Sequence, residues 1–188
     1  MTTTFICAAL GALLALSGIL CGLPVLAQDA KPGIYVEEDK DWGVPPTKVL
    51  RTVGYHGPTP RQIPGGKVIT TGELQKLMER EPRPYVIDVL GGGVHRTIAG
   101  AFWMLGSGPG DMSKDEEERF AKAIAAFAGG DKSRAMVFFC VDNECWLSYN
   151  AALRAIALGY TNVMWYRGGI AAWRAAGNMM AQSDPFFW

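Results

Sequence analysis

The chain has 188 residues, a length typical of one domain with extensions rather than of two full domains. Its 18 Lys and Arg residues balance 18 Asp and Glu residues, which excludes a strongly basic nucleic-acid-binding surface and an acidic disordered tail. Hydrophobic residues make up 49% of the chain, enough for a packed core, and four cysteines are too few for a disulfide-stapled miniprotein. We therefore expect a globular protein with no nucleic-acid partner.

The charges are unevenly distributed, because no charged side chain precedes Asp29. The apolar run over residues 5–27 ends in Val-Leu-Ala, which suits signal peptidase, so residues 1–27 are predicted to be a signal peptide cleaved after Ala27. The alternative is an uncleaved membrane anchor, since the run is long enough to span a bilayer and no Lys or Arg precedes it. Under either interpretation the folded part lies outside the cytoplasm, and we expect a periplasmic protein.

Two of the four cysteines, Cys7 and Cys21, belong to the predicted signal peptide, which leaves Cys140 and Cys145 in the mature chain. In an oxidising compartment such a pair is either a resting disulfide or a working thiol site, and both interpretations stay open. Two cysteines are too few for a zinc site, and neither histidine has the spacing of a metal ligand. No metal or other cofactor is therefore expected.

The mature chain divides into three parts. Residues 28–66 are rich in Pro, Gly and charge and show no sustained period, which predicts an irregular extension lying over the domain. From Lys67 the pattern becomes an alternation of strands and helices, so we place the domain at residues 67–180 and a C-terminal tail at 181–188. His56 lies in the extension and is given no role.

The expected elements are taken in chain order. The predicted strands cover residues 67–69, 85–89, 101–104, 135–139 and 162–165. Capping boxes at Thr70 and Ser113 open two helices, the first reaching about Arg80 and the second ending at Gly129. Two further helices are expected over residues 146–158 and after Gly168-Gly169. This alternation is typical of a doubly wound α/β fold, in which ligands bind at the carboxyl ends of the strands.

A cysteine stands at such an end, because the apolar strand over residues 135–139 runs directly into Cys140. A tight loop that leads into a helix directs backbone N–H groups at the sulfur, which favours a thiolate. The thiolate is the nucleophilic form of cysteine. We therefore predict Cys140 as a catalytic residue, with Cys145 able to resolve a sulfenic acid or persulfide into a disulfide that a partner later reduces.

The stretch from Phe138 to Gly177 resembles the carboxyl half of a rhodanese domain, with the strand-end cysteine, Leu-Gly-Tyr-x-Asn-Val and Gly-Gly-Ile-x-x-Trp. Upstream, Tyr-Val-Ile-Asp-Val and Ile-Ala-Gly-Ala are similar to two further segments of that family. The resemblance covers roughly residues 67–177. It implies a single α/β domain with a central parallel sheet flanked by helices, thiosulfate sulfurtransferase-type chemistry, and a persulfide carried on Cys140.

The loop that ends in Cys145-Trp146 is similar to a periplasmic subgroup named for a Cys-x-x-Cys-Trp motif, and so is Gly-Pro-Thr-Pro at 57–60. That subgroup is associated with PQQ-dependent alcohol oxidation, although the spacing here is Cys-x4-Cys. The resemblance implies an alternative role as a weak or inactive accessory module, with a quinoprotein dehydrogenase or cytochrome as partner. A sulfurtransferase would instead meet a small sulfur donor or acceptor, or a thiol reductant.

The cysteine loop departs from active rhodaneses, which commonly carry an arginine and a Ser or Thr at its end. Negative charge in the loop opposes an anionic substrate and disfavours a thiolate. The candidate substrate-binding residues of the loop are Val141, Asp142, Asn143, Glu144 and Trp146. Phosphatases on this fold need a longer loop that ends in arginine, and none follows Cys140 before Arg154, so that class is excluded.

Two auxiliary candidates lie upstream of the loop. Asp88 follows a buried strand, where a carboxylate is more often a loop cap than a catalytic acid. Arg96 is a candidate for the positive charge that the loop lacks. The histidine that usually precedes the family's Ile-Pro-Gly-Ala segment is Thr97 here, and His95 is displaced by two positions.

Overall fold

Five parallel strands form the central sheet in the order β1-β6-β5-β2-β4. The strands are β1 (Lys67–Ile69), β2 (Tyr85–Asp88), β4 (Phe102–Trp103), β5 (Met136–Phe139) and β6 (Val163–Tyr166). In this computed structural model, residue 1 and residues 37–188 are described. The predicted signal peptide, apart from Met1, and the start of the extension lie outside the described residues.

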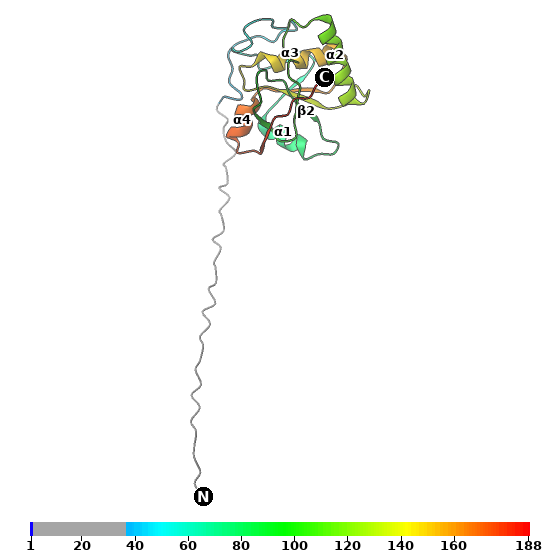
Figure 1. Ribbon diagram of the computed structural model, residues 1–188. Coiled ribbons are helices and arrows are strands. Elements are labelled where there is room, and N and C mark those ends of the chain that lie inside the picture. Colours follow the sequence, from blue (N-terminus) through cyan, green and yellow to red (C-terminus); the bar gives the residue numbers. More distant parts are fainter. Residues whose placement is uncertain (2–36) are drawn as a thin grey trace.

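The four helices of residues 37–188 cover both faces of the sheet. They are α1 (Thr71–Met78), α2 (Lys114–Ala128), α3 (Trp146–Ala157) and α4 (Gly169–Ala175). Figure 1 shows α2 and α3 on one side of the strands and α1 and α4 on the other. The core divides in the same way, because Phe138 and Trp165 pack in the cluster with α2 and α3, whereas Phe139 and Tyr166 pack in the cluster with α1 and α4. Strands that are buried on both faces need no alternation of polar and apolar residues, which explains their continuous apolar sequences. The predicted α/β fold with a central parallel sheet flanked by helices is confirmed.

Both predicted capping boxes are present. The side chain of Thr70 accepts a hydrogen bond from the N–H of Glu73, whose carboxylate accepts from the N–H of Thr70, and Ser113 and Glu116 are paired in the same way. Gly129 ends α2 in the left-handed conformation, with φ of 59°. Helix α1 ends at Met78, two residues before the predicted limit, and Glu79 is its C-cap.

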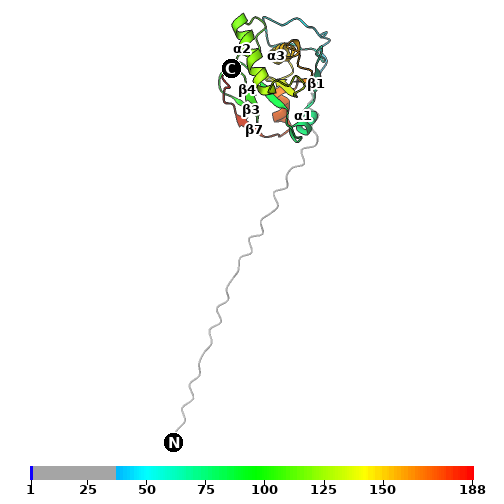
Figure 2. The same ribbon diagram turned by 90° about the vertical axis from the view of Figure 1, so that its right-hand side faces the viewer.

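A second, two-stranded sheet was not predicted from the sequence. It pairs β3 (Arg96–Ile98) with β7 (Met180–Gln182) in antiparallel register. Figure 2 shows both strands beside β4, on the side of the molecule where the chain's C-terminus lies. Strands of three residues carry almost no periodic pattern, and these two are far apart in the sequence. Strand β7 also crosses the position at which we divided the domain from its tail.

Within residues 37–188, the helices are all too short or too polar to cross a bilayer. The membrane-anchor alternative concerns residues 5–27, which lie outside the described residues.

Candidate functional site

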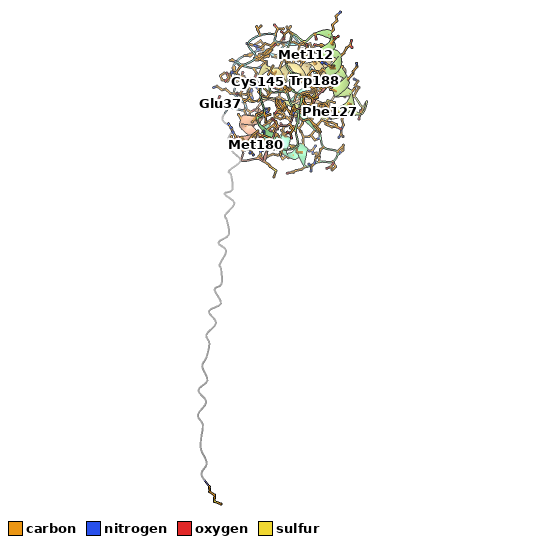
Figure 3. All side chains as sticks on the ribbon, viewed as in Figure 1. Glu37, Met112, Phe127, Cys145, Met180 and Trp188 are labelled. Carbon is orange, nitrogen blue, oxygen red and sulfur yellow. A yellow bond between two sulfur atoms is a disulfide. The ribbon has the colours of Figure 1, made fainter. Side chains whose placement is uncertain are left out.

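A disulfide joins Cys140 to Cys145 at the carboxyl edge of the central sheet. Cys140 directly follows β5, and Cys145 directly precedes α3, with 6.1 Å between their Cα atoms. Cys140 is 0% exposed and Cys145 is 4% exposed. Figure 3 labels Cys145 near Glu37, at the side of the molecule where the described extension begins. Of the two interpretations that the sequence left open, the structure thus contains the disulfide, with both residues buried.

Three amides at the end of the loop that leads into α3 are bonded to oxygen acceptors, not to the sulfur. The N–H of Glu144 donates to Asp142 Oδ1 at 2.9 Å, and the N–H of Cys145 donates to the Asp142 carbonyl at 3.3 Å. The N–H of Trp146, at the start of α3, donates to the Tyr55 carbonyl at 2.9 Å. These three N–H groups are therefore engaged by other acceptors, and the expectation of an N–H cradle at Cys140 concerns the amides of residues 141–143.

The start of α4 holds the other end of the loop. The N–H of Ile170 donates to the Cys140 carbonyl at 2.9 Å, and the N–H of Ala171 donates to the Val141 carbonyl at 2.8 Å. Gly169 makes this close approach possible, because a Cβ there would collide with the Cys140 carbonyl oxygen. Its φ of +60° is also a conformation that side-chain-bearing residues rarely adopt.

The extension covers the cysteine loop directly through residues 55–59, which we call the strap. His56 and Cys145 form an antiparallel bridge, flanked by the bond from Trp146 to Tyr55 and by a 2.8 Å bond from the Gly57 N–H to the Glu144 carbonyl. The Trp146 Nε1–H donates to the Pro58 carbonyl at 3.1 Å, and the Thr59 hydroxyl donates to the Asn143 carbonyl. The strap therefore contacts the part of the loop that leads into α3.

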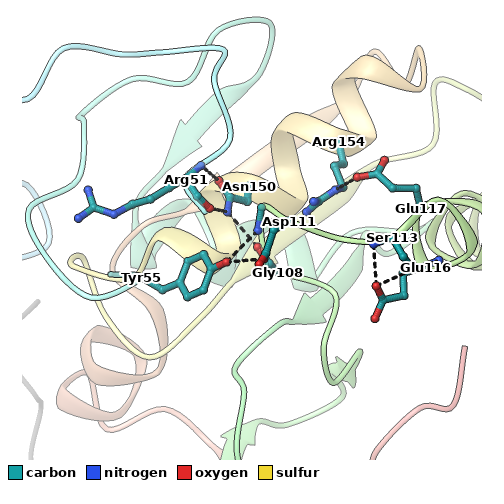
Figure 4. A network of polar contacts seen from close by, with 10 residues as sticks. Arg51, Tyr55, Gly108, Asp111, Ser113, Glu116, Glu117, Asn150 and Arg154 are labelled. Atoms are coloured by element: carbon teal, nitrogen blue, oxygen red, sulfur yellow. Dashed lines mark hydrogen bonds and ion pairs between the residues drawn. The ribbon is translucent and has the colours of Figure 1, made fainter. Parts of the chain in front are cut away.

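Helix α3 fixes the rest of the extension. The Tyr149 hydroxyl donates to the Thr47 carbonyl at 2.8 Å and accepts from the Thr47 N–H at 2.9 Å. Asn150 makes the equivalent pair of bonds with the backbone of Arg51, as Figure 4 shows. Tyr149 and Asn150 are both fully buried. The extension is thus anchored by side chains of the domain, although it contains no regular helix or strand over residues 37–66.

The predicted loop residues are all placed around the disulfide, with Val141, Asp142 and Glu144 partly buried and Asn143 buried. The Asn143 amide donates to the Glu37 carbonyl. Asp142 Oδ2 lies 3.5 Å from the ring Nε2 of His56, the residue to which we gave no role. Trp146 is buried and packs edge-on against Tyr149, with 5.1 Å between ring centroids, so it walls the loop on the α3 side.

The two auxiliary candidates serve other parts of the fold. Asp88 is fully buried and caps the loop after β2, since its Oδ1 accepts from the Leu90 N–H at 2.9 Å. Its Oδ2 is bonded by Thr97 Oγ1 at 2.5 Å and by His95 Nε2 at 2.8 Å. Arg96 donates to the Met180 carbonyl at 3.0 Å, which joins β3 to β7 rather than to the cysteine loop.

Sequence reasoning missed Arg167, which directly follows β6 and is 2% exposed. Its Nε donates to Thr59 Oγ1 at 3.0 Å, Nη1 to the Glu38 carbonyl at 2.8 Å and Nη2 to the Thr59 carbonyl at 3.2 Å. Burial lowers the pKa of the Arg167 guanidinium. The sequence did offer one clue. Arg167 follows β6, which pairs with β5, the strand that leads to Cys140, and neighbouring parallel strands end at the same edge of a sheet.

Arg154, the first arginine after Cys140 in the sequence, belongs to a different contact. Its Nε donates to Glu117 Oε1 at 2.9 Å, which joins α3 to α2 (Figure 4).

A pocket of about 210 Å³ opens beside the loop, between the extension and α4. Asp142 and Asn143 line it from the loop, Gly168 and Ala171 from the start of α4, and Glu37 from the extension. Neither cysteine lines it.

The family model named "Rhodanese-like domain" matches residues 70–176, more than half of the chain. No curated protein matched the sequence. Among solved structures, the Alr3790 protein of Anabaena sp. is 24% identical over 60% of this chain and 80% of its own, with a TM-score of 0.43. Thiosulfate sulfurtransferase of Pseudomonas aeruginosa is 15% identical over 64% of this chain and 21% of its own, with a TM-score of 0.45. Ygr203w, described as a yeast protein tyrosine phosphatase of the Rhodanese family, is 19% identical over 61% of this chain and 88% of its own, with a TM-score of 0.46.

Reducing the disulfide should lower the free energy of unfolding by about 2 kcal/mol, because a bridge across five positions restricts the unfolded chain. The measurement is urea unfolding with and without a thiol-free reductant. A variant with both Cys140→Ser and Cys145→Ser retains Cys7 and Cys21 and should not respond to the reductant. An equal response from that variant would contradict the prediction.

Replacing Gly169 by alanine should destabilise the protein by about 1–3 kcal/mol, since the Cβ collides with the loop backbone in a strained conformation. Gly72→Ala is the matched control, because Gly72 lies in α1 and a Cβ added there would meet no heavy atom within 4 Å. Helix propensity predicts that this control is neutral or stabilising. Thermal unfolding compares the two, and equal melting temperatures would show that the contact with Cys140 is unimportant.

Proposed function

The chain belongs to the rhodanese-like domain family, and from this premise we propose that it is a sulfur-transfer protein in which Cys140 carries a persulfide and Cys145 resolves it. The observation that carries the proposal is the Cys140–Cys145 disulfide at the carboxyl edge of the sheet. The loops at this edge are where α/β folds bind ligands. A disulfide there is the product expected when one thiol resolves a sulfur adduct on the other.

The transfer half-reaction begins from the reduced protein. The Cys140 thiolate attacks the outer sulfur of thiosulfate, the sulfur–sulfur bond of thiosulfate breaks, and sulfite leaves with the electron pair. The sulfur that remains on Cys140 is a persulfide. A nucleophilic acceptor such as cyanide then takes the outer sulfur as thiocyanate and returns Cys140 to the thiolate.

The resolving step competes with transfer to an acceptor. The Cys145 thiolate attacks the inner sulfur of the Cys140 persulfide, hydrosulfide leaves with the electron pair, and the disulfide forms. A thiol reductant reopens the pair by exchange, because two of its thiols are oxidised to a disulfide while both cysteines are reduced. The partners of this cycle are thus a small sulfur donor, an acceptor and a thiol reductant.

A second candidate function is supported by the strap. The strap covers the part of the loop that leads into α3, both cysteines are buried, and Asp142 and Glu144 oppose an anionic substrate. These features favour a weak or inactive accessory module. In that role the protein would bind a periplasmic quinoprotein dehydrogenase or cytochrome of a PQQ-dependent alcohol oxidation system. Both candidates include export to the periplasm.

A thiosulfate and cyanide assay on the full chain distinguishes the two candidates. The sulfurtransferase should form thiocyanate only after reduction of the disulfide, since the oxidised protein has no nucleophile on Cys140. Cys140→Ser should abolish the reaction. Cys145→Ser is the matched control and should keep it without prior reduction, because it cannot form the disulfide.

Absence of thiocyanate from the reduced wild-type protein would reject sulfur transfer from thiosulfate and favour the accessory module. Activity that survives Cys140→Ser would exclude Cys140 as the carrier.

Export predicts a specific new N-terminus. Cleavage after Ala27 should yield a mature protein that begins at Gln28 and is found in the periplasmic fraction. N-terminal sequencing of the fractionated protein checks this. An intact N-terminus in the membrane fraction would instead support the anchor.

A further inference from the structure

Cys140 and Arg167 leave neighbouring strands at the same edge of the sheet. Strands β5 and β6 are paired in parallel, with Phe139 opposite Tyr166. Cys140 and Arg167 are the next residues along the two strands. Backbones of paired strands lie about 4.8 Å apart, so the register brings the chain at Arg167 beside the chain at Cys140 as the strands end.

The Arg167 guanidinium is buried and its hydrogen-bond acceptors are neutral. They are the hydroxyl and carbonyl of Thr59 and the carbonyl of Glu38. Within residues 37–188, the ion pairs are formed by other side chains and none includes Arg167. The Glu38 carboxylate is turned to Thr71, to whose N–H it bonds at 2.6 Å. The structure therefore holds a buried positive charge without a carboxylate in ion-pair contact. Arg61, Asp39 and Asp41 of the extension act on it only through space.

This charge is coupled to the cysteine loop through one residue. Thr59 Oγ1 accepts from Arg167 Nε and donates its own hydrogen to the Asn143 carbonyl in the loop. In the oxidised protein the sulfurs are neutral. Opening the disulfide creates a thiol whose ionised form is an anion, and charges interact more strongly in a buried site than in water.

We propose that Arg167 supplies the positive charge that stabilises the Cys140 thiolate and persulfide once the disulfide is open. The inference rests on the proposed function of Cys140. The loop has no arginine of its own, so the residue that would stabilise the negative charge on Cys140 comes from the end of a different strand. Arg167 acts against Asp142 and Glu144, which lie in the loop and disfavour the anion, while His56 faces Asp142. It also favours the reduced pair, because stabilising the thiolate lowers the free energy of the reduced form relative to the disulfide.

The test is the pH dependence of Cys140 alkylation in the reduced full chain carrying Cys145→Ser. Iodoacetamide is the probe, and peptide mass spectrometry separates Cys140 from Cys7 and Cys21. We expect half-maximal reactivity at least about one pH unit below the ordinary thiol value of about 8.5. A midpoint at or above about 8.5 overturns the proposal without any change to Arg167.

Variants then assign the effect to the charge. Arg167→Gln should raise the midpoint by about one unit or more, which slows alkylation about tenfold at pH values below it. Arg167→Lys should retain most of the reactivity. Arg174→Gln removes an exposed arginine of α4 as the matched control and should leave the midpoint unchanged. Circular dichroism confirms that each variant is folded.

An unchanged midpoint in folded Arg167→Gln overturns the proposal, and so does an equal shift in the Lys and Gln variants, which would indicate packing rather than charge. If Arg167→Gln does not fold, the midpoint of the protein with Arg167 intact decides the question. The outcome is separable from that of the proposed function. A lowered midpoint without thiocyanate formation supports the role of Arg167 and rejects sulfur transfer from thiosulfate.

Discussion

The backbone pairing between the strap and the start of α3 is the contact on which access to the candidate site depends. It uses the Trp146 N–H, the first of the helix, which the Tyr55 carbonyl satisfies. A helix N-terminus is a natural place to bind an anion, because its N–H groups lack partners within the helix. Here part of the extension occupies that position. The Trp146 N–H at this helix end is therefore satisfied by the chain's own backbone.

The parallel sheet explains why the charged residues around the loop come from distant parts of the sequence. Asp88, Cys140 and Arg167 each stand at or directly after the carboxyl end of a strand. Paired parallel strands end at one edge, so these residues converge without any local sequence motif. Asp88 accepts a hydrogen bond from the Leu90 N–H and so caps its own loop, whereas Arg167 donates a hydrogen bond to the Glu38 carbonyl of the extension. Both residues lie at that edge, so their position alone does not distinguish them. Their hydrogen-bond partners do, because Asp88 has the structural role of a loop cap and Arg167 is the candidate functional residue.

Most of the central sheet and its helices were predictable because they depend on local patterns. The apolar run before Cys140 and the capping boxes at Thr70 and Ser113 each produced the expected element. The strand pair β3–β7 was not predictable, since its two strands lie far apart in the sequence and neither segment carries a signal for the other. The family was recognised from several weak motifs in combination, and the family model then matched residues 70–176.

The sequence predicted which loop contains the candidate site but not which residues contact that loop. The position of Cys140 after a buried strand was sufficient to place the loop at the sheet edge. The strap was not predictable, because Tyr55 and Gly57 contribute backbone groups, and backbone groups have no signature in a sequence. Arg167 was missed for a related reason, since its significance depends on which strand lies next to β5.

The two cysteines, although joined by the disulfide, are contacted by different parts of the chain. The carbonyl of Cys140 is bonded to α4, inside the domain, whereas Cys145 is bridged to His56 of the extension. A change in the extension therefore alters the surroundings of Cys145 while the domain keeps Cys140 in place. Substitutions in residues 55–58 offer a way for selection to adjust how readily the sulfur centre is reached, whereas a change at Thr59 would also alter the hydrogen bonds of Arg167.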